Sequence, residues 1–182
     1  MCLLIGAFLT GAIVWLRRQY AEFYGQLSED YEDNFPIFEL DQCLRGEMIC
    51  EGLIFGPLGR VTSTFAADFT ITWQDEKGVI DEHFRYDDGS TQVRQWRITK
   101  QENGRFDLQA DDVPGGGWGV TSGSAAQMRY PIRLPADAGG HVLKSIDWMY
   151  LTPDGTIMNR SQFRKYGFKV AELVATIRPK EV

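Results

Sequence analysis

The chain of 182 residues is poor in the residue types that build most active sites and metal centres. It has only two histidines, His83 and His141, and three cysteines. No spacing resembles a zinc or iron motif, although His83 with Asp81 or Glu82 could in principle ligate a metal. No Ser–His–Asp, Cys–His or nucleophile-elbow pattern is present. We therefore expect no catalytic residue, no metal and no cofactor, and a protein that is not an enzyme.

Positive charge is also scarce, since 25 Asp and Glu outnumber 19 Lys and Arg and the net charge is −6. A nucleic-acid partner is excluded, because it would require a basic footprint. Basic side chains do outnumber acidic ones after Thr156. They could face anionic lipid head groups or form an ordinary solvated strand face. These residues are Arg160, Arg164, Lys165, Lys169, Arg178 and Lys180.

Only one long hydrophobic run is present, from Cys2 to Leu16, and Arg17 and Arg18 close it. Its fifteen positions span about 22 Å as a helix, against roughly 30 Å of hydrocarbon, and flanking arginines could snorkel. We predict a membrane anchor over residues 1–18, with a processed leader as the alternative. Because both arginines follow the run, the positive-inside rule places the globular part in the cytoplasm of a single-pass inner-membrane protein.

Residues 19–37 form an acidic spacer, and residues 38–182 form the main domain. In this domain Val61 to Trp73 alternates apolar and polar side chains, which predicts a long strand with one buried face. A short helix is expected near Phe38–Arg45. The strands expected between Gly- and Pro-containing turns, this one included, are 48–55, 60–74, 79–86, 91–100, 105–110, 118–123, 125–134, 141–152, 156–165 and 168–177.

About ten strands joined by short hairpins, without a crossover helix, are typical of a sandwich or a closed barrel. Hairpin connectivity favours an all-β antiparallel up-and-down barrel of 8–10 strands, preceded by one transmembrane helix. The loops Asp87–Gly89 and Pro153–Gly155 end in glycine, so each fixes the register of its hairpin. The predicted cross-strand pairs are Tyr86/Ser90, Phe84/Gln92, Glu82/Arg94, Ile80/Trp96, Tyr150/Met158, Trp148/Arg160, Asp147/Ser161 and Met149/Asn159.

Several polar groups have two interpretations. Glu82 and Arg94 could hold a ligand head group inside the barrel or form a cross-strand pair outside it. Arg160 could anchor an anionic ligand against Trp148 or make a cation–π contact that pins two strands. Asp111 and Asp112 are adjacent and point in opposite directions, so we expect solvated turn acids rather than a catalytic pair.

Some segments resemble a proteobacterial domain-of-unknown-function family, number 3833, over most of the chain from about Phe38. Many members are small envelope lipoproteins, and the resemblance implies a lipocalin-like fold and a periplasmic location. The chain differs from them in having no lipid-bearing cysteine. No activity follows from the resemblance. The segments that carry it are 84–92 (FRYDDGSTQ), 147–151 (DWMYL), 159–161 (NRS) and 165–170 (KYGFKV).

The leading hypothesis is a membrane-anchored, lipocalin-like protein that binds a small apolar or amphipathic, lipid-like molecule in the barrel. The alternative is a scaffold or interaction protein whose barrel is filled by its own side chains, and a cavity above roughly 300 Å³ would favour binding. An enzyme acting on a lipid-like substrate would require a cavity residue with a strongly shifted pKa. The expected ligand-binding residues are Phe65, Phe69, Trp73, Glu82, Phe84, Tyr86, Arg94, Trp96, Trp148 and Arg160.

Overall fold

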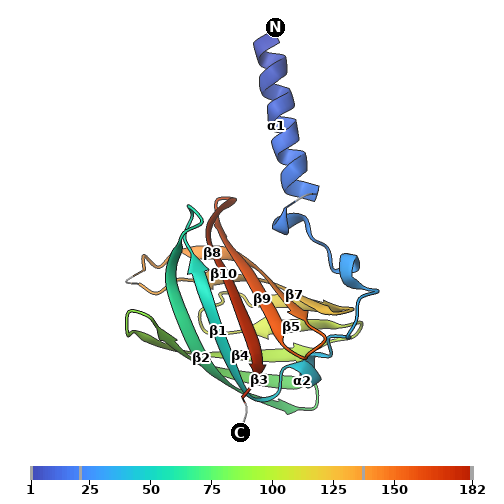
Figure 1. Ribbon diagram of the computed structural model, residues 1–182, viewed down its shortest axis with the longest axis vertical. Helices are drawn as coiled ribbons and strands as arrows, with labels where there is room; N and C mark the ends of the chain where they lie inside the picture. The colour runs from blue at the N-terminus through green and yellow to red at the C-terminus, as the bar shows by residue number, and fades with distance from the viewer. Residues whose placement is uncertain (1, 21, 137, 181–182) are drawn as a thin grey trace.

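Ten antiparallel strands close into one barrel in the computed structural model, which describes residues 2–20, 22–136 and 138–180 (Figure 1). Each strand pairs with its neighbour in sequence, and β1 pairs with β10 to complete the ring. This confirms the antiparallel up-and-down barrel and excludes the sandwich. The elements are α1 (Cys2–Tyr20), η1 (Phe23–Gly25), η2 (Ser28–Tyr31), α2 (Leu40–Cys43), β1 (Gly46–Phe55), β2 (Val61–Gln74), β3 (Lys77–Tyr86), β4 (Thr91–Lys100), β5 (Arg105–Gln109), β6 (Gly117–Ser122), β7 (Ala125–Arg133), β8 (Val142–Leu151), β9 (Ile157–Lys165) and β10 (Phe168–Pro179).

Strand β2 shows how the sequence pattern builds the core. Phe65, Phe69 and Ile71 are buried, whereas Thr70 and Thr72 between and beside them are exposed. Successive side chains of a strand point to opposite faces, so the apolar set faces the barrel axis and the polar set faces solvent. The predicted alternation is therefore confirmed.

The hairpin registers also agree with the sequence-based prediction. In the β3–β4 hairpin, Glu82 is opposite Arg94 and Ile80 is opposite Trp96. The turn closes with the Tyr86 amide donating to the Ser90 carbonyl at 2.9 Å. In the β8–β9 hairpin the observed pairs are Asp147/Ser161, Trp148/Arg160, Met149/Asn159 and Tyr150/Met158.

One end of the barrel is closed by α2, which corresponds to the short helix expected before the first strand. Leu40 and Leu44 are buried there and line the interior. The indole Nε1 of Trp73 donates a hydrogen bond to the Leu44 carbonyl at 2.7 Å, which ties this end of β2 to the helix. Lys100 at the end of β4 forms an ion pair with Asp41 of α2 at 3.1 Å.

Residues 22–38, which we call the N-terminal strap, run along the outside of the barrel. Much of the predicted acidic spacer is therefore packed against the domain. The Tyr31 ring lies 5.1 Å from that of Trp148, and the Phe38 amide donates to the Gly123 carbonyl at 2.7 Å. Gly123 has a φ of +49°, and a Cβ on it would lie 1.7 Å from the Tyr31 carbonyl oxygen, so only glycine fits beneath the strap.

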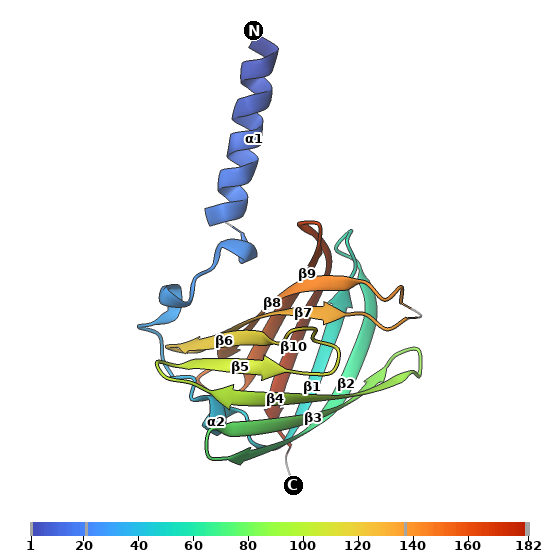
Figure 2. The same ribbon diagram turned by 180° about the vertical axis from the view of Figure 1, so that it is seen from behind.

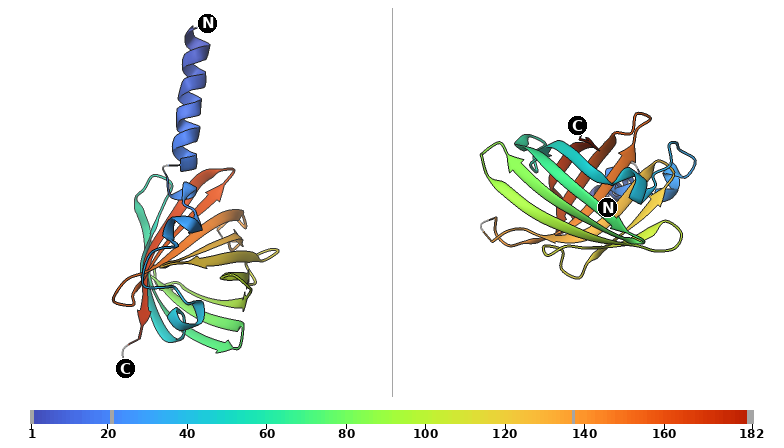
Figure 3. Two further views of the ribbon diagram at one scale, coloured as in Figure 1. Left: turned by 90° about the vertical axis from the view of Figure 1, so that its right-hand side faces the viewer. Right: turned by 90° about the horizontal axis from the view of Figure 1, so that it is seen from below.

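Helix α1 extends away from the barrel (Figures 1 and 3). Within the described residues, no helix has both the length and the apolar character needed to cross a membrane. The predicted transmembrane helix is therefore not supported. The uncharged run from Cys2 to Leu16 does lie in a helix, but it ends at Arg17 after about 22 Å, short of the hydrocarbon thickness.

Candidate functional site

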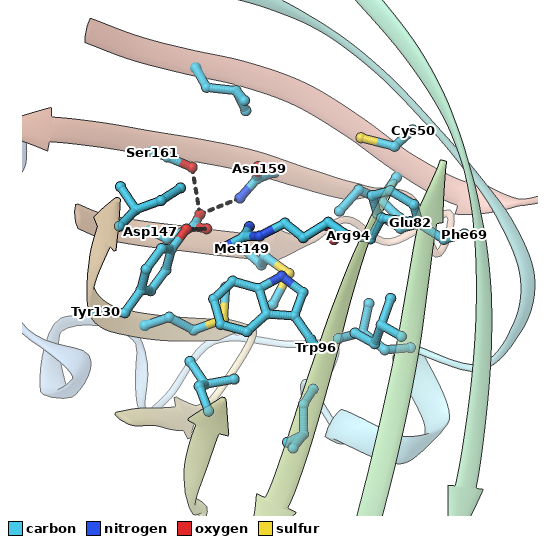
Figure 4. A pocket seen from close by; sticks show the side chains of 18 of the residues that line it. Cys50, Phe69, Glu82, Arg94, Trp96, Tyr130, Asp147, Met149, Asn159 and Ser161 are labelled. Atoms are coloured by element: carbon cyan, nitrogen blue, oxygen red, sulfur yellow. Dashed lines mark hydrogen bonds between the residues drawn. The ribbon is translucent and has the colours of Figure 1, made fainter. Parts of the chain in front are cut away.

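A cavity of about 130 Å³ lies inside the barrel next to α2 (Figure 4). Its wall is mostly apolar, and a few polar side chains converge on it from β3, β4, β7, β8 and β9. This composition is typical of a small-molecule site. The polar lining residues are Glu82, Arg94, Tyr130, Asp147, Asn159 and Ser161, and the apolar ones include Phe65, Phe69, Phe84, Trp96, Met128, Met149, Phe163 and Leu173.

Glu82 of β3 is the most perturbed of these groups. Its side chain is buried, and burial raises its pKa from the ordinary 4.5 to about 7, with Asp147 and Asp112 adding to the rise and Arg94 opposing it. Its Oε2 atom is buried without a hydrogen-bond partner. A buried carboxyl oxygen that lacks a partner is destabilising, and a ligand that donates a hydrogen bond would relieve this penalty.

Arg94 of β4 extends across the cavity above the Trp96 ring, with 4.0 Å from the guanidinium carbon to the ring centroid (Figure 4). Its Nε atom lies 2.9 Å from Asp112 Oδ2, and its Nη2 is buried without a partner. Glu82 and Arg94 are opposite each other and both face inward, but Arg94 takes Asp112 as its ion-pair partner. The predicted outer-surface pair is therefore excluded, and Nη2 remains as a free donor.

Asp147 of β8 is the centre of a satisfied hydrogen-bond cluster. Its Oδ1 accepts from Asn159 Nδ2 at 2.5 Å and Ser161 Oγ at 2.8 Å, and its Oδ2 accepts from the Tyr130 hydroxyl at 3.1 Å. Burial raises the pKa of Asp147, while these hydrogen bonds oppose the rise. Burial also raises the pKa of Tyr130 well above its usual range. The cluster fixes one polar wall of the cavity.

A second hollow, of about 470 Å³, forms the open mouth of the barrel at the end opposite α2. It shares Phe65, Phe84, Arg94, Phe163 and Leu173 with the interior cavity, so the two hollows meet at Arg94. The mouth is lined mainly by apolar side chains. Those not shared with the interior include Ile54, Tyr86, Leu134, Pro135, Leu143, Val170 and Ala171.

The predicted ligand-binding residues divide into four groups. Tyr86 lines the mouth, and Trp73 lies at the α2 end, packed against the core and outside both hollows. Trp148 and Arg160 lie on the outer face of the barrel. The residues that line the interior are Phe65, Phe69, Glu82, Phe84, Arg94 and Trp96, and their role in binding stays a prediction.

The placement of Trp148 and Arg160 is a correction with a clear reason. In the β8–β9 hairpin, the face that carries Trp148 points outward, where Phe23 of the strap lies 4.6 Å from the Arg160 guanidinium. Arg160 also pairs with Glu172 at 2.5 Å. The expected cation–π contact with Trp148 is replaced by one with Phe23.

Sequence reasoning missed the polar wall formed by Asp147, Asn159 and Ser161. The predicted register of the β8–β9 hairpin was correct and already placed these residues together on one face. The prediction was wrong only about which face of the hairpin points into the barrel. Asp112 was also expected to be a solvated turn acid, but its side chain is 24% exposed, against 97% for Asp111, and it pairs with Arg94.

The site offers little for covalent chemistry. Cys50 lines the cavity, but burial raises its pKa to about 12, so its thiol is a poor nucleophile. Cys43 and Cys50 are both free thiols. Within the described residues, no three His, Cys, Asp or Glu side chains are grouped to hold a metal ion.

Similar barrels occur among solved structures. The S-type phycobiliprotein lyase CPES from Guillardia theta superposes with a TM-score of 0.55 at 9% identity, over 78% of this chain and 90% of that one. A protein of unknown function from the DUF3598 family of Nostoc punctiforme gives a TM-score of 0.54 at 12% identity, over 80% of this chain. The match spans about half of that second protein, 51% of its length. At these identities the likeness supports the lipocalin-like fold alone.

No curated protein is significantly similar to the chain in sequence. One family model does match, described as a protein of unknown function, DUF3833, and the match extends over residues 21–179. This range contains the strap, α2 and all ten strands. The chain therefore belongs to the DUF3833 family.

Proposed function

We propose that the barrel binds a small amphipathic, lipid-like molecule whose apolar body fills the mouth and whose polar end reaches Arg94 and Glu82. The observation that carries this proposal is the meeting of an apolar mouth with two buried, unpartnered polar atoms, Glu82 Oε2 and Arg94 Nη2. Buried polar atoms are normally satisfied, so a pair of them at the base of an open hollow favours a ligand.

The volumes limit how such a ligand is held. Small-molecule sites usually occupy about 300–1,000 Å³, so the interior cavity of about 130 Å³ is too small for a whole ligand, and the mouth, at about 470 Å³, is large enough. The ligand therefore sits mainly in the mouth, and only a short polar end enters the interior. Leu173 and Phe163 line both hollows and would contact the ligand where it narrows.

The charges indicate the chemistry of that polar end. Arg94 is already paired with Asp112, and Glu82 and Asp147 also face the cavity, so three carboxyl groups accompany one guanidinium. A second anion would be poorly compensated. We therefore favour an uncharged group that accepts from Arg94 Nη2 and donates to Glu82 Oε2, such as a hydroxyl, an amide or a protonated acid, over a carboxylate.

The test is native mass spectrometry with lipid extraction on the full chain, comparing wild type with Leu173→Trp. The larger side chain would occupy the junction of the two hollows, so the yield of co-purified molecule should fall several-fold. Leu53→Trp is the matched control, because Leu53 is half exposed on β1 and lines neither hollow. Equal yields from the two variants would rule out this site.

The scaffold hypothesis keeps one observation in its favour, which is the small volume of the interior. If wild type carries no molecule and gains none when incubated with fatty alcohols, fatty acids and phospholipids, a filled barrel that presents its outer surface is the better account. The raised pKa of Glu82 is the strongly shifted pKa of a cavity residue that an enzyme would require. However, burial makes the Cys50 thiol in the same cavity a poor nucleophile, so binding remains the function that we propose.

A further inference from the structure

A large groove lies on the outer wall of the barrel, over β6, β7, β8 and the end of β9. Its volume is about 940 Å³, and of the residues that line the interior cavity it shares Tyr130 alone. Tyr24 of the strap forms one side of it. The lining residues are Tyr24, Gly116, Gly117, Trp118, Arg129, Tyr130, Pro131, His141, Val142, Lys144, Ile146, Arg164, Lys165, Tyr166 and Gly167.

The charge of the groove is opposite to that of the protein. The chain carries a net charge of −6, yet the described residues that line the groove include Arg129, Lys144, Arg164, Lys165 and His141 and no carboxylate. In the described part of the chain, the ammonium groups of Lys144 and Lys165 form no ion pair. These two ammonium groups therefore contribute positive potential to the groove.

The other basic residues near the C-terminus behave differently. Lys169 forms an ion pair with Glu172 at 2.5 Å, and Arg160 pairs with the same carboxylate. Arg178 and Lys180 pair with carboxylates of β1 and β2. Four of the six basic residues expected near the C-terminus are thus paired with carboxylates, whereas Lys165, which forms no ion pair within the described residues, lies in the groove.

Aromatic rings stand among the basic groups. The Tyr24 ring lies 4.9 Å from the Arg164 guanidinium and 6.0 Å from that of Arg129, and the Trp118 ring also lies 6.0 Å from the Arg129 guanidinium. Such contacts hold cations in place without neutralising them. Tyrosine and tryptophan beside arginine and lysine are characteristic of surfaces at the membrane–water interface.

The tip of the β9–β10 hairpin continues this surface. Tyr166 is 91% exposed and Phe168 is 75% exposed, and Leu58 at the β1–β2 turn is 83% exposed. Both hairpins point toward the side of the barrel on which α1 stands (Figures 1 and 2). Helix α1 itself exposes apolar side chains, among them Phe8 and Trp15. Apolar tips next to a basic groove match the polarity gradient from acyl chain to head group.

We propose that this groove binds the phosphate of anionic phospholipid head groups at a membrane surface, with Tyr166 and Phe168 in the interfacial layer. Lys144, Lys165 and Arg129 contact the phosphates. Lys165 and His141 line both the groove and the barrel mouth, so binding of the groove to a membrane surface places the mouth beside the membrane. The proposal is independent of whether the interior holds a ligand.

The test is co-sedimentation of the full chain with phosphatidylcholine vesicles prepared with and without phosphatidylglycerol. Wild type should prefer the anionic vesicles. A surface lysine contributes about a 5-fold preference, so Lys144→Gln with Lys165→Gln should weaken binding to anionic vesicles about 25-fold. Binding to pure phosphatidylcholine, to which α1 can contribute, should not change.

The matched control is Lys77→Gln with Arg105→Gln, which removes the same charge from exposed residues of β3 and β5 outside the groove. This variant should retain most of the preference, and an equal loss in both variants would overturn the proposal. So would equal binding of wild type to both vesicle types. If inorganic phosphate binds the groove but the wild-type protein shows no preference for anionic vesicles, the ligand of the groove is a free anion and not a membrane surface.

Discussion

Glu82→Gln should remove a large part of the dependence of stability on pH. Burial raises the pKa of Glu82 from 4.5 to about 7. Between these values the folded protein binds a proton that the unfolded chain has released, so the free energy of unfolding falls as pH rises. At about 1.4 kcal/mol per pH unit, the span from 4.5 to about 7 amounts to roughly 3 kcal/mol.

Glutamine has the shape of the protonated side chain and cannot ionise. Below about pH 4.5 the variant and wild type should therefore have similar stability, and above about pH 7 the variant should be more stable by about 3 kcal/mol. The assay is denaturant unfolding of both proteins across this range. Burial also raises the pKa of Asp147, but Asp147 is present in both proteins, so their difference isolates Glu82.

The control is Glu102→Gln, which changes an exposed carboxylate in the β4–β5 turn and should leave the pH profile as in wild type. A difference between Glu82→Gln and wild type that stays constant from acid to neutral pH would refute the reasoning. It would mean that Glu82 is solvated or already paired in the folded protein, and the unpartnered oxygen at the base of the mouth would lose its significance for binding.

Three further outcomes follow from the packing. Gly119→Ala should destabilise the barrel by about 1–3 kcal/mol in thermal unfolding, because the new Cβ would lie 2.2 Å from the Phe106 ring. Trp148→Ala should destabilise it by about 3–5 kcal/mol, and limited proteolysis should then cut the strap (22–38) first. Gly123→Ala should give the same early cleavage, since its Cβ would displace the strap; a protected strap in both variants would contradict its docking.

The predictable part of the fold depends on local patterns. A period of two along 61–73 requires a strand with one buried face, and glycine-ended turns such as Asp87–Gly89 set the register of the next strand. Both were correct, as was the pairing of Glu82 with Arg94 across the β3–β4 hairpin. These features follow from neighbours in sequence, whose geometry is set by the chain itself.

Local patterns in the sequence thus predicted the barrel, its order of strands and the buried face of β2, but they left open whether Glu82 and Arg94 face the cavity. Only the tertiary structure decided which face of the β8–β9 hairpin points inward. Both faces mix aromatic and polar side chains, so polarity does not distinguish Trp148 from Asp147. The strap, more than one hundred residues away in sequence, covers Trp148 outside the barrel and leaves Asp147 inside. The ion pair of Arg94 with Asp112 and the volume of the mouth likewise depend on contacts between distant segments, which local sequence patterns do not predict.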